Sequence, residues 1–191
     1  MAFNKKPARW KEAFDYWTKS AKQGHDQAQF YLGTCFDFGL GRRKNLKKAF
    51  HWYSLAAENG HTDAQYNVAN CYRDGLGVIK NGKKAVAWYK KLAKDGDIEA
   101  QLNLGYSYFY GEGIRRDWKM AIYWYKKAAQ KGESKAQYNL GLCFWNGHGV
   151  TKSLRWSIFW MTKAKAGGHE KAGLKLKELT NRKKKLIPRL Q

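Results

Sequence analysis

Apolar residues along this chain follow two alternating helical patterns, and each pattern ends at glycine. Over residues 63–74 the apolar positions lie three and four residues apart, which predicts a helix with one buried face. These positions are Ala64, Val68, Ala69 and Tyr72. A second helix is predicted over 81–95, with a buried stripe of Ala85, Trp88, Tyr89, Leu92 and Ala93. Gly75 and Gly96 follow the two helices, as glycine does where φ becomes positive at a helix end.

The same pair of patterns returns every 36 residues. The residues that mark this period are Gly24, Gly60, Gly96, Gly132 and Gly168, and Ala28, Ala64, Ala100, Ala136 and Ala172. A fixed period of this length is typical of a repeat array, in which each unit buries its apolar face only against its neighbours. Helix pairs repeated in register predict an all-α fold, an α-solenoid.

The two ends of the array depart from the repeat. Residues 9–25 match only the second helix of a repeat, and residues 170–191 match a first helix followed by a basic tail. Lysine replaces apolar positions in that last helix, as expected of a cap whose outer face meets water. We therefore predict one repeat domain over 1–191, with full repeats at 26–61, 62–97, 98–133 and 134–169.

Three blocks of the repeat resemble a known family. AQYNLG at 136–141, the GxG turn at 111–113 and WYKKAA at 124–129 are similar to the Sel-1-like repeats, which are relatives of the tetratricopeptide repeats. The resemblance runs from about Trp10 to Leu179. It implies a right-handed superhelix of antiparallel helix pairs and, usually, a role in protein interaction, and many such proteins are bacterial adaptors or regulators.

By the same resemblance, the first helices line a concave groove. The groove candidates are Tyr31, Asn67, Asn70, Asn103, Tyr106 and Asn139. Side-chain amides can donate and accept hydrogen bonds toward the backbone of an extended peptide. The alternative is that these asparagines only bond neighbouring repeats.

Columns that vary chemically are further candidates, because the scaffold does not fix them. Near the end of the first helices they supply Arg73, Phe109, Tyr110 and Trp145. The tryptophans that recur in phase are expected in the core instead; they are Trp52, Trp88, Trp124 and Trp160.

Charge adds a third set of candidates. The chain has 37 Lys and Arg against 15 Asp and Glu, a net charge of +22. Two columns beside the start of the second helices are almost wholly basic: Lys11, Lys44, Lys47, Lys80, Lys83, Arg116, Lys119, Lys152 and Arg155. Cations at a helix N-terminus oppose the helix dipole, so their recurrence there indicates a ladder of anion sites. The N-caps between the two columns are predicted to be Asn45, Asn81, Asp117 and Ser153.

Other chemistry is not expected. The cysteines at 35, 71 and 143 share one column, and equivalent positions in stacked repeats lie too far apart for a disulfide or a shared zinc. His25, His61 and His169 share a turn column, where capping is the simpler role. No catalytic or phosphate-cradling motif is present, so no enzyme, metal or cofactor is predicted. The N-terminus lacks the apolar segment of a signal peptide, and the presence of at most one cysteine per repeat favours a reducing compartment, so we expect a cytoplasmic chain.

The sequence thus predicts a non-enzymatic, monomeric scaffold that binds an acidic or peptide-like protein partner. The alternative is a binder of polyanions, meaning nucleic acid, polyphosphate or an anionic membrane surface, through the basic ladder. RNA recognition would require exposed aromatic rings between the cations.

Overall fold

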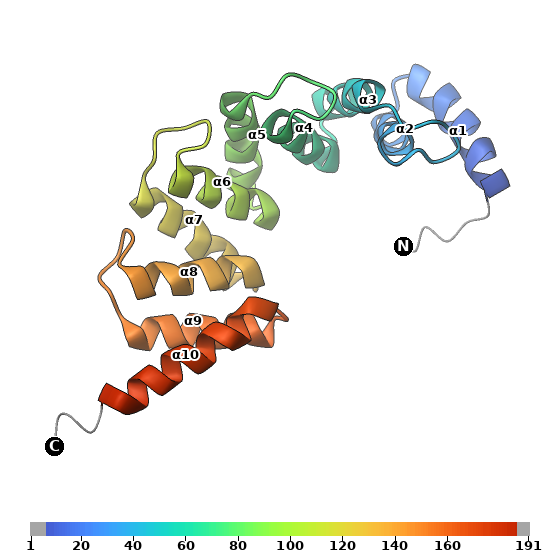
Figure 1. The fold of residues 1–191 in the computed structure, drawn as a ribbon. Helices are drawn as coiled ribbons and strands as arrows, with labels where there is room; N and C mark the ends of the chain where they lie inside the picture. Colours follow the sequence, from blue (N-terminus) through green and yellow to red (C-terminus); the bar gives the residue numbers. More distant parts are fainter. Residues whose placement is uncertain (1–6, 187–191) are drawn as a thin grey trace. The chain divides into compact units, whose positions relative to one another are not determined.

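The described part of the chain is entirely helical. This computed structural model describes residues 7–186, and over that range it holds ten α-helices and no strand (Figure 1). The helices are α1 (Pro7–Lys22), α2 (Asp26–Phe38), α3 (Leu46–Glu58), α4 (Thr62–Asp74), α5 (Gly82–Lys94), α6 (Ile98–Tyr110), α7 (Trp118–Gln130), α8 (Ser134–Asn146), α9 (Leu154–Ala166) and α10 (Glu170–Leu186). The predicted all-α repeat fold is confirmed, with the helices predicted over 63–74 and 81–95 placed within one residue of α4 and α5.

The chain forms two compact units, Met1–Leu92 and Ala93–Gln191. In the first unit α1 packs against α2, α2 against α3 and α3 against α4, and in the second unit each helix from α6 to α9 packs against the next one along the chain. The single repeat domain over 1–191 stays a prediction, because it concerns how the two units are joined.

The second helices begin at the predicted N-caps. Four cap side chains accept a hydrogen bond from the backbone N–H three residues later: Asn45 from Lys48 at 3.0 Å, Asn81 from Lys84 at 3.0 Å, Asp117 from Met120 at 3.0 Å and Ser153 from Trp156 at 3.3 Å. Each bond satisfies one amide that the helix itself leaves without an acceptor. The cap column is therefore confirmed by its geometry.

Within a repeat, the two helices approach closely where a glycine faces an aromatic ring. A Cβ on Gly33 would lie 2.6 Å from Cδ1 of Tyr53, and a Cβ on Gly105 would lie 2.6 Å from Cδ1 of Tyr125. Both tyrosines are almost wholly buried. The absence of a side chain on the first helix is thus what lets the ring of the second helix lie flat against it.

Between repeats, a buried glutamine joins two helices. Nε2 of Gln65 donates to the carbonyl of Ala57 at 3.1 Å, and Nε2 of Gln137 donates to that of Ala129 at 3.1 Å. These carbonyls lie in the last turn of α3 and α7, where the helix has no amide of its own to satisfy them. Gln29 and Gln101 make the same bond to Ala21 and Ala93.

The glycine-rich loops also carry contacts between repeats. Gly41 has a φ of 68° and Gly149 a φ of 70°, in the left-handed region that favours glycine. A Cβ on Gly149 would lie 2.6 Å from the carbonyl oxygen of Trp118, at the start of the preceding second helix. Gly41 lies in the same way against Trp10. Each loop is therefore held against the helix start of the repeat before it.

Helix α10 closes the second unit. Its Ala172 and Leu179 are fully buried together with Met161 and Ala164 of α9, while Leu174 is 73% exposed on the opposite side. The apolar inner face and wetted outer face fit the predicted cap. Of the basic tail at its end, residues 187–191 and the side chains of 182–186 lie outside the described part of the chain.

We expect Gly105→Ala to lower the free energy of unfolding by about 1–3 kcal/mol, because the new methyl group overlaps the buried ring of Tyr125. Gly173→Ala is the control: its nearest neighbour is the flexible chain of Lys165 at 3.9 Å, so the better helix former should stabilise by about 0.5–1 kcal/mol. Guanidinium unfolding followed by circular dichroism measures both. Equal effects in the two variants would contradict the close-contact account.

We expect Leu179→Ala to destabilise the second unit by about 2–5 kcal/mol, because it leaves a cavity between α9 and α10. Leu174→Ala, on the exposed face of the same helix, should change stability by less than about 0.5 kcal/mol. Thermal unfolding compares the two variants. A neutral Leu179→Ala would mean that α10 does not act as a cap.

Candidate anion-binding site

The starts of the second helices differ in charge from the starts of the first helices. The first turns of α2, α4 and α6 each hold an acidic residue, Asp26, Asp63 and Glu99 respectively. The first turns of α3, α5, α7 and α9 hold none. A helix dipole favours acidic residues in the first turn, as in α2, α4 and α6, and opposes cations there, as in α3, α5, α7 and α9. The basic residues there are consequently not explained by helix stability.

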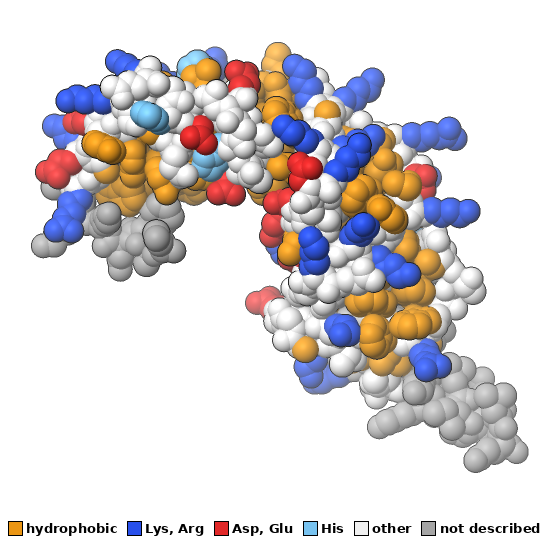
Figure 2. Space-filling view, turned by 180° about the vertical axis from the view of Figure 1, so that it is seen from behind, with side chains coloured by type: hydrophobic (Ala, Val, Ile, Leu, Met, Phe, Trp, Pro, Cys, Tyr) orange, Lys and Arg blue, Asp and Glu red, His pale blue; other side chains and the backbone are white. Residues whose placement is uncertain are grey.

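All nine residues of the predicted basic ladder are exposed. In the first unit these are Lys11, Lys44, Lys47, Lys80 and Lys83, and in the second unit Arg116, Lys119, Lys152 and Arg155. On the face drawn in Figure 2, many Lys and Arg side chains stand out from the surface and acidic side chains are fewer. Eight ladder residues flank the N-caps of α3, α5, α7 and α9, one before each cap and one in the first turn, whereas Lys11 lies inside α1, which begins at Pro7 rather than beside Lys11.

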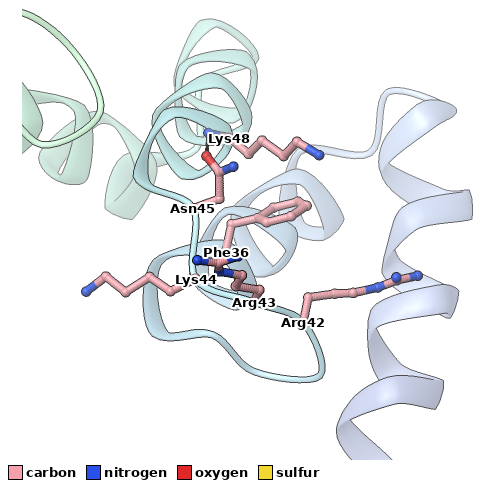
Figure 3. A pocket seen from close by; sticks show the side chains of 6 residues that line it. All are labelled: Phe36, Arg42, Arg43, Lys44, Asn45 and Lys48. Atoms are coloured by element: carbon pink, nitrogen blue, oxygen red, sulfur yellow. Dashed lines mark hydrogen bonds between the residues drawn. The ribbon is translucent and has the colours of Figure 1, made fainter.

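In the first unit the ladder borders an open recess of about 510 Å³. It is lined by Phe36 of α2, by Arg42, Arg43 and Lys44 of the following loop, and by Asn45 and Lys48 at the start of α3 (Figure 3). In Figure 3, Arg42 and Lys48 extend toward the same side with Phe36 between them, and Lys44 extends toward the opposite side. Sequence reasoning did not select Lys48, because its column also holds Met120 and Trp156. It did not select Phe36, because the column of Phe36 is aromatic throughout and looks like an ordinary core position.

Two of the cations are positioned by aromatic rings. Nζ of Lys48 lies 5.4 Å from the ring centre of Phe36, and Cζ of Arg42 lies 4.8 Å from that of Phe14. Arg42 also forms an ion pair with Asp15 at 3.7 Å, in which both side chains are about half exposed. Such an exposed pair adds little stability. The aromatic contacts, in contrast, restrict where the two charges can lie.

The position of Arg42 is apolar in the other repeats. The equivalent residues are Val78, Ile114 and Val150, and both valines pack against core clusters of their own units. In repeat one the same loop position carries a half-exposed guanidinium. A charged residue at this loop position is therefore particular to repeat one among the four repeats.

A second, smaller cavity lies on the first helices of the second unit. It measures about 50 Å³ and is lined by Tyr106, Phe109, Tyr110, Tyr125, Asn139 and Leu142. It brings together residues that the sequence assigned to two separate sets, the groove and the variable column. Tyr106 and Tyr110 are the exposed members, at 41% and 57%, and their ring centres lie 4.4 Å apart.

In the first unit the corresponding residues are tied to the scaffold. The hydroxyl of Tyr89 donates to Oδ1 of Asn70 at 2.6 Å, and Arg73 donates both to that hydroxyl at 3.2 Å and to Asp74 at 2.7 Å. Burial raises the pKa of Tyr89 far above its ordinary value, so the hydroxyl keeps its proton. These bonds favour a structural role for Asn70 and Arg73.

The remaining groove and column candidates differ in their contacts. Asn103 donates to the carbonyl of Glu99 at 3.1 Å, whereas Asn67 and Asn139 make no hydrogen bond within residues 7–186. The ring of Tyr31 lies 5.0 Å from that of Trp17, and Lys175 lies 5.1 Å from the ring centre of Trp145. Asn67 and Asn139 are thus the groove amides that still have both donors and acceptor to offer.

Cysteine and histidine positions carry no reactive site. The three cysteines are free thiols, as predicted, and all are buried. His61 caps α4 by accepting from the backbone of Ala64 at 3.3 Å, and burial lowers the pKa of His169. Among the described residues, no group of three His, Cys, Asp or Glu side chains is arranged to hold a metal ion.

The fold and the site together define a helical-repeat protein with a strongly basic face. It belongs to the Sel1 repeat family, whose model matches residues 11–25, 26–61, 62–97, 98–133 and 134–169. Sel1 repeat proteins are generally non-enzymatic scaffolds for protein–protein interaction. No described helix is long and apolar enough to cross a membrane.

Solved structures with this fold include two that are 32% identical to the chain. One is a Sel1 repeat protein from Oxalobacter formigenes, with a TM-score of 0.80 over 87% of this chain and 66% of that one. The other is c5321, a protective antigen with an SLR fold from uropathogenic Escherichia coli, with a TM-score of 0.85 over 88% of this chain and 36% of that one. The chain thus spans less than two thirds of either protein.

A third solved structure shares the fold at lower identity. Cysteine rich protein B of Helicobacter pylori is 24% identical, with a TM-score of 0.52 over 71% of this chain and 97% of that one. The comparison with curated proteins gave no match.

The buried thiols should resist modification in the native protein. Burial raises the pKa of Cys35 and Cys71 to about 11 and that of Cys143 to about 12, so almost no thiolate is present at pH 8. We expect Ellman's reagent to label none of the three rapidly at pH 8 until guanidinium unfolds the chain. Fast labelling of the native protein would contradict the burial of this column.

Proposed function

We propose that this chain is a non-enzymatic scaffold that binds an acidic segment of a partner protein through the basic ladder. The observation that carries the proposal is the charge at the second-helix starts, where exposed cations flank the N-caps and no first turn of α3, α5, α7 or α9 holds an acidic residue. The cations oppose the helix dipole there, and a bound anion reverses that penalty. The helix starts also offer backbone amides that donate toward an anion.

At the recess of the first unit a protein partner is favoured over nucleic acid by the state of the aromatic rings, whereas Trp118 and Trp156 are exposed beside the ladder of the second unit. At the recess, Phe36 already lies under Lys48 and Phe14 is buried beneath Arg42, so neither ring offers a free face for a base. The family is a family of protein-interaction scaffolds. Asn67 and Asn139 add amides that can meet a peptide backbone. We propose that the chain acts as a monomer. Its unpaired cysteines support a location in the cytoplasm.

The test uses a labelled twelve-residue glutamate peptide as a model acidic partner. Replacing Lys47, Lys83 and Lys119 by Gln should weaken binding and flatten its dependence on salt, because fewer counterion contacts are made. Fluorescence anisotropy at several salt concentrations measures both. Stability should hold or rise slightly, by a few tenths of a kcal/mol per site, since each substitution removes an unfavourable dipole contact.

The control removes equal charge elsewhere. Lys22, Lys94 and Lys126 are exposed and lie away from the second-helix starts, so their replacement by Gln should affect binding less. If both triple variants lose affinity equally, net charge alone explains the binding and the ladder has no special role.

A further inference from the structure

The recess of repeat one carries more positive charge than the structure balances. It gathers Arg42, Arg43 and Lys48, with Lys44 at its edge. Among the described residues, the one ion pair formed by these four side chains is that between Arg42 and Asp15. Like charges held this close repel one another, and the repulsion falls when an anion of more than one charge enters.

The donors of the recess suit a tetrahedral dianion better than a carboxylate. A guanidinium can place two parallel N–H bonds on a phosphoryl group, and an ammonium can bind its remaining oxygens as a point charge. Phosphoserine brings a charge near −2 and three acceptor oxygens, whereas a glutamate brings a single charge and two oxygens. The cations at 42 and 48 extend toward the same side from two different segments, with Phe36 between them (Figure 3).

The remaining parts of the site keep these donors in place. Lys48 lies over Phe36 and Arg42 over Phe14, which reduces the side-chain freedom lost on binding. The cap of α3 is the neutral Asn45, whereas the equivalent cap in repeat three is Asp117. The amides of Leu46 and Lys47 donate no hydrogen bond within residues 7–186, and they face no negatively charged cap.

The other repeats do not reproduce this arrangement. At the positions of Arg42 and Lys48, repeat three has Ile114 and Met120, and repeat four has Val150 and Trp156. Repeat two keeps a lysine at the second position but has Val78 at the first, packed against the core. A general attraction for acidic chains therefore extends along the ladder, while a site for a single dianion exists in repeat one.

We infer that the recess formed by Phe36, Arg42, Arg43, Asn45 and Lys48 binds a phosphorylated serine or threonine side chain of the partner protein. This inference rests on the proposed function, because it specifies which group of an acidic protein segment occupies the first repeat. The recess of about 510 Å³ leaves room for the residues on either side of the phosphoryl group.

The experiment compares three capped five-residue peptides, Gly-Gly-X-Gly-Gly, in which X is phosphoserine, glutamate or serine. Isothermal titration gives the affinities, and NMR shifts of the Leu46, Lys47 and Lys48 amides locate the site. The phosphoserine peptide should bind about tenfold more tightly than the glutamate peptide, because charge-assisted bidentate bonds are the stronger ones. The serine peptide should not bind.

Three variants test the residues. Arg42→Gln with Lys48→Gln should weaken phosphopeptide binding at least about tenfold. The matched control is Lys19→Gln with Lys22→Gln, which removes equal exposed charge from the far end of α1 and should change affinity less than about twofold. Asp15→Asn should tighten binding, because it removes the carboxylate that competes for Arg42. Thermal unfolding checks that each variant is folded.

Each contrary result identifies what has failed. Equal affinities for the phosphoserine and glutamate peptides would overturn this inference and leave the acidic-partner proposal standing. So would a phosphopeptide that does not bind while the twelve-residue glutamate peptide does. Inorganic phosphate that binds as tightly as the phosphopeptide, or a short single-stranded RNA that displaces it with higher affinity, would overturn the assignment to a protein side chain. If neither the twelve-residue glutamate peptide nor the phosphoserine peptide binds, both proposals are overturned.

Discussion

The buried hydrogen bond from a glutamine amide to the end of the preceding helix fixes how one repeat follows another. Gln65 and Gln137 show it at 3.1 Å, and in each case the acceptor is a carbonyl that its own helix cannot satisfy. Breaking the bond would leave a buried side-chain amide without a partner, which is costly in a core, and would leave the carbonyl with only the backbone N–H of Gly60 or Gly132. Once this register is set, each GxG loop falls on the start of the previous second helix, as Gly149 does on Trp118. The recess of repeat one exists because its loop is held beside α1 in this way.

The second-helix starts show a conflict between local stability and surface charge. Their caps are well formed, since three of the four cap hydrogen bonds measure 3.0 Å. Their first turns nevertheless omit the acidic residues that α2, α4 and α6 carry at the same place. A scaffold that used charge only for solubility would gain a few tenths of a kcal/mol per helix from acidic residues there. The retained cations are best explained by an anionic partner that approaches this edge.

The helices could be predicted well from the sequence because the same pattern of apolar residues, caps and glycines occurs in each repeat. The columns of Gly105 and Tyr125, and the cap column of Asn45, follow from period and residue type alone. The contacts of single side chains did not follow. Asn70 and Asn103 were both assigned to the groove, yet Asn70 accepts from Tyr89 and Asn103 donates to a backbone carbonyl. Such pairings depend on which residue each neighbouring helix presents, and periodicity carries no information about that.

The recess was missed for a related reason. A search along columns finds residues that recur, whereas Arg42 matters because it does not recur: it stands where other repeats have Val78, Ile114 and Val150. In a repeat protein the recurring positions maintain the stack, because every repeat must solve the same packing problem. A charged residue at one of those positions gives up apolar burial that its equivalents keep, as Val150 does in its core cluster. Arg42 instead contacts Phe14 and Asp15 of α1, and it lies beside the loop cations, Phe36 and the start of α3. The proposed phosphoryl site therefore lies where repeat one departs from the repeat pattern, and the proposed broader surface consists of the cations that recur.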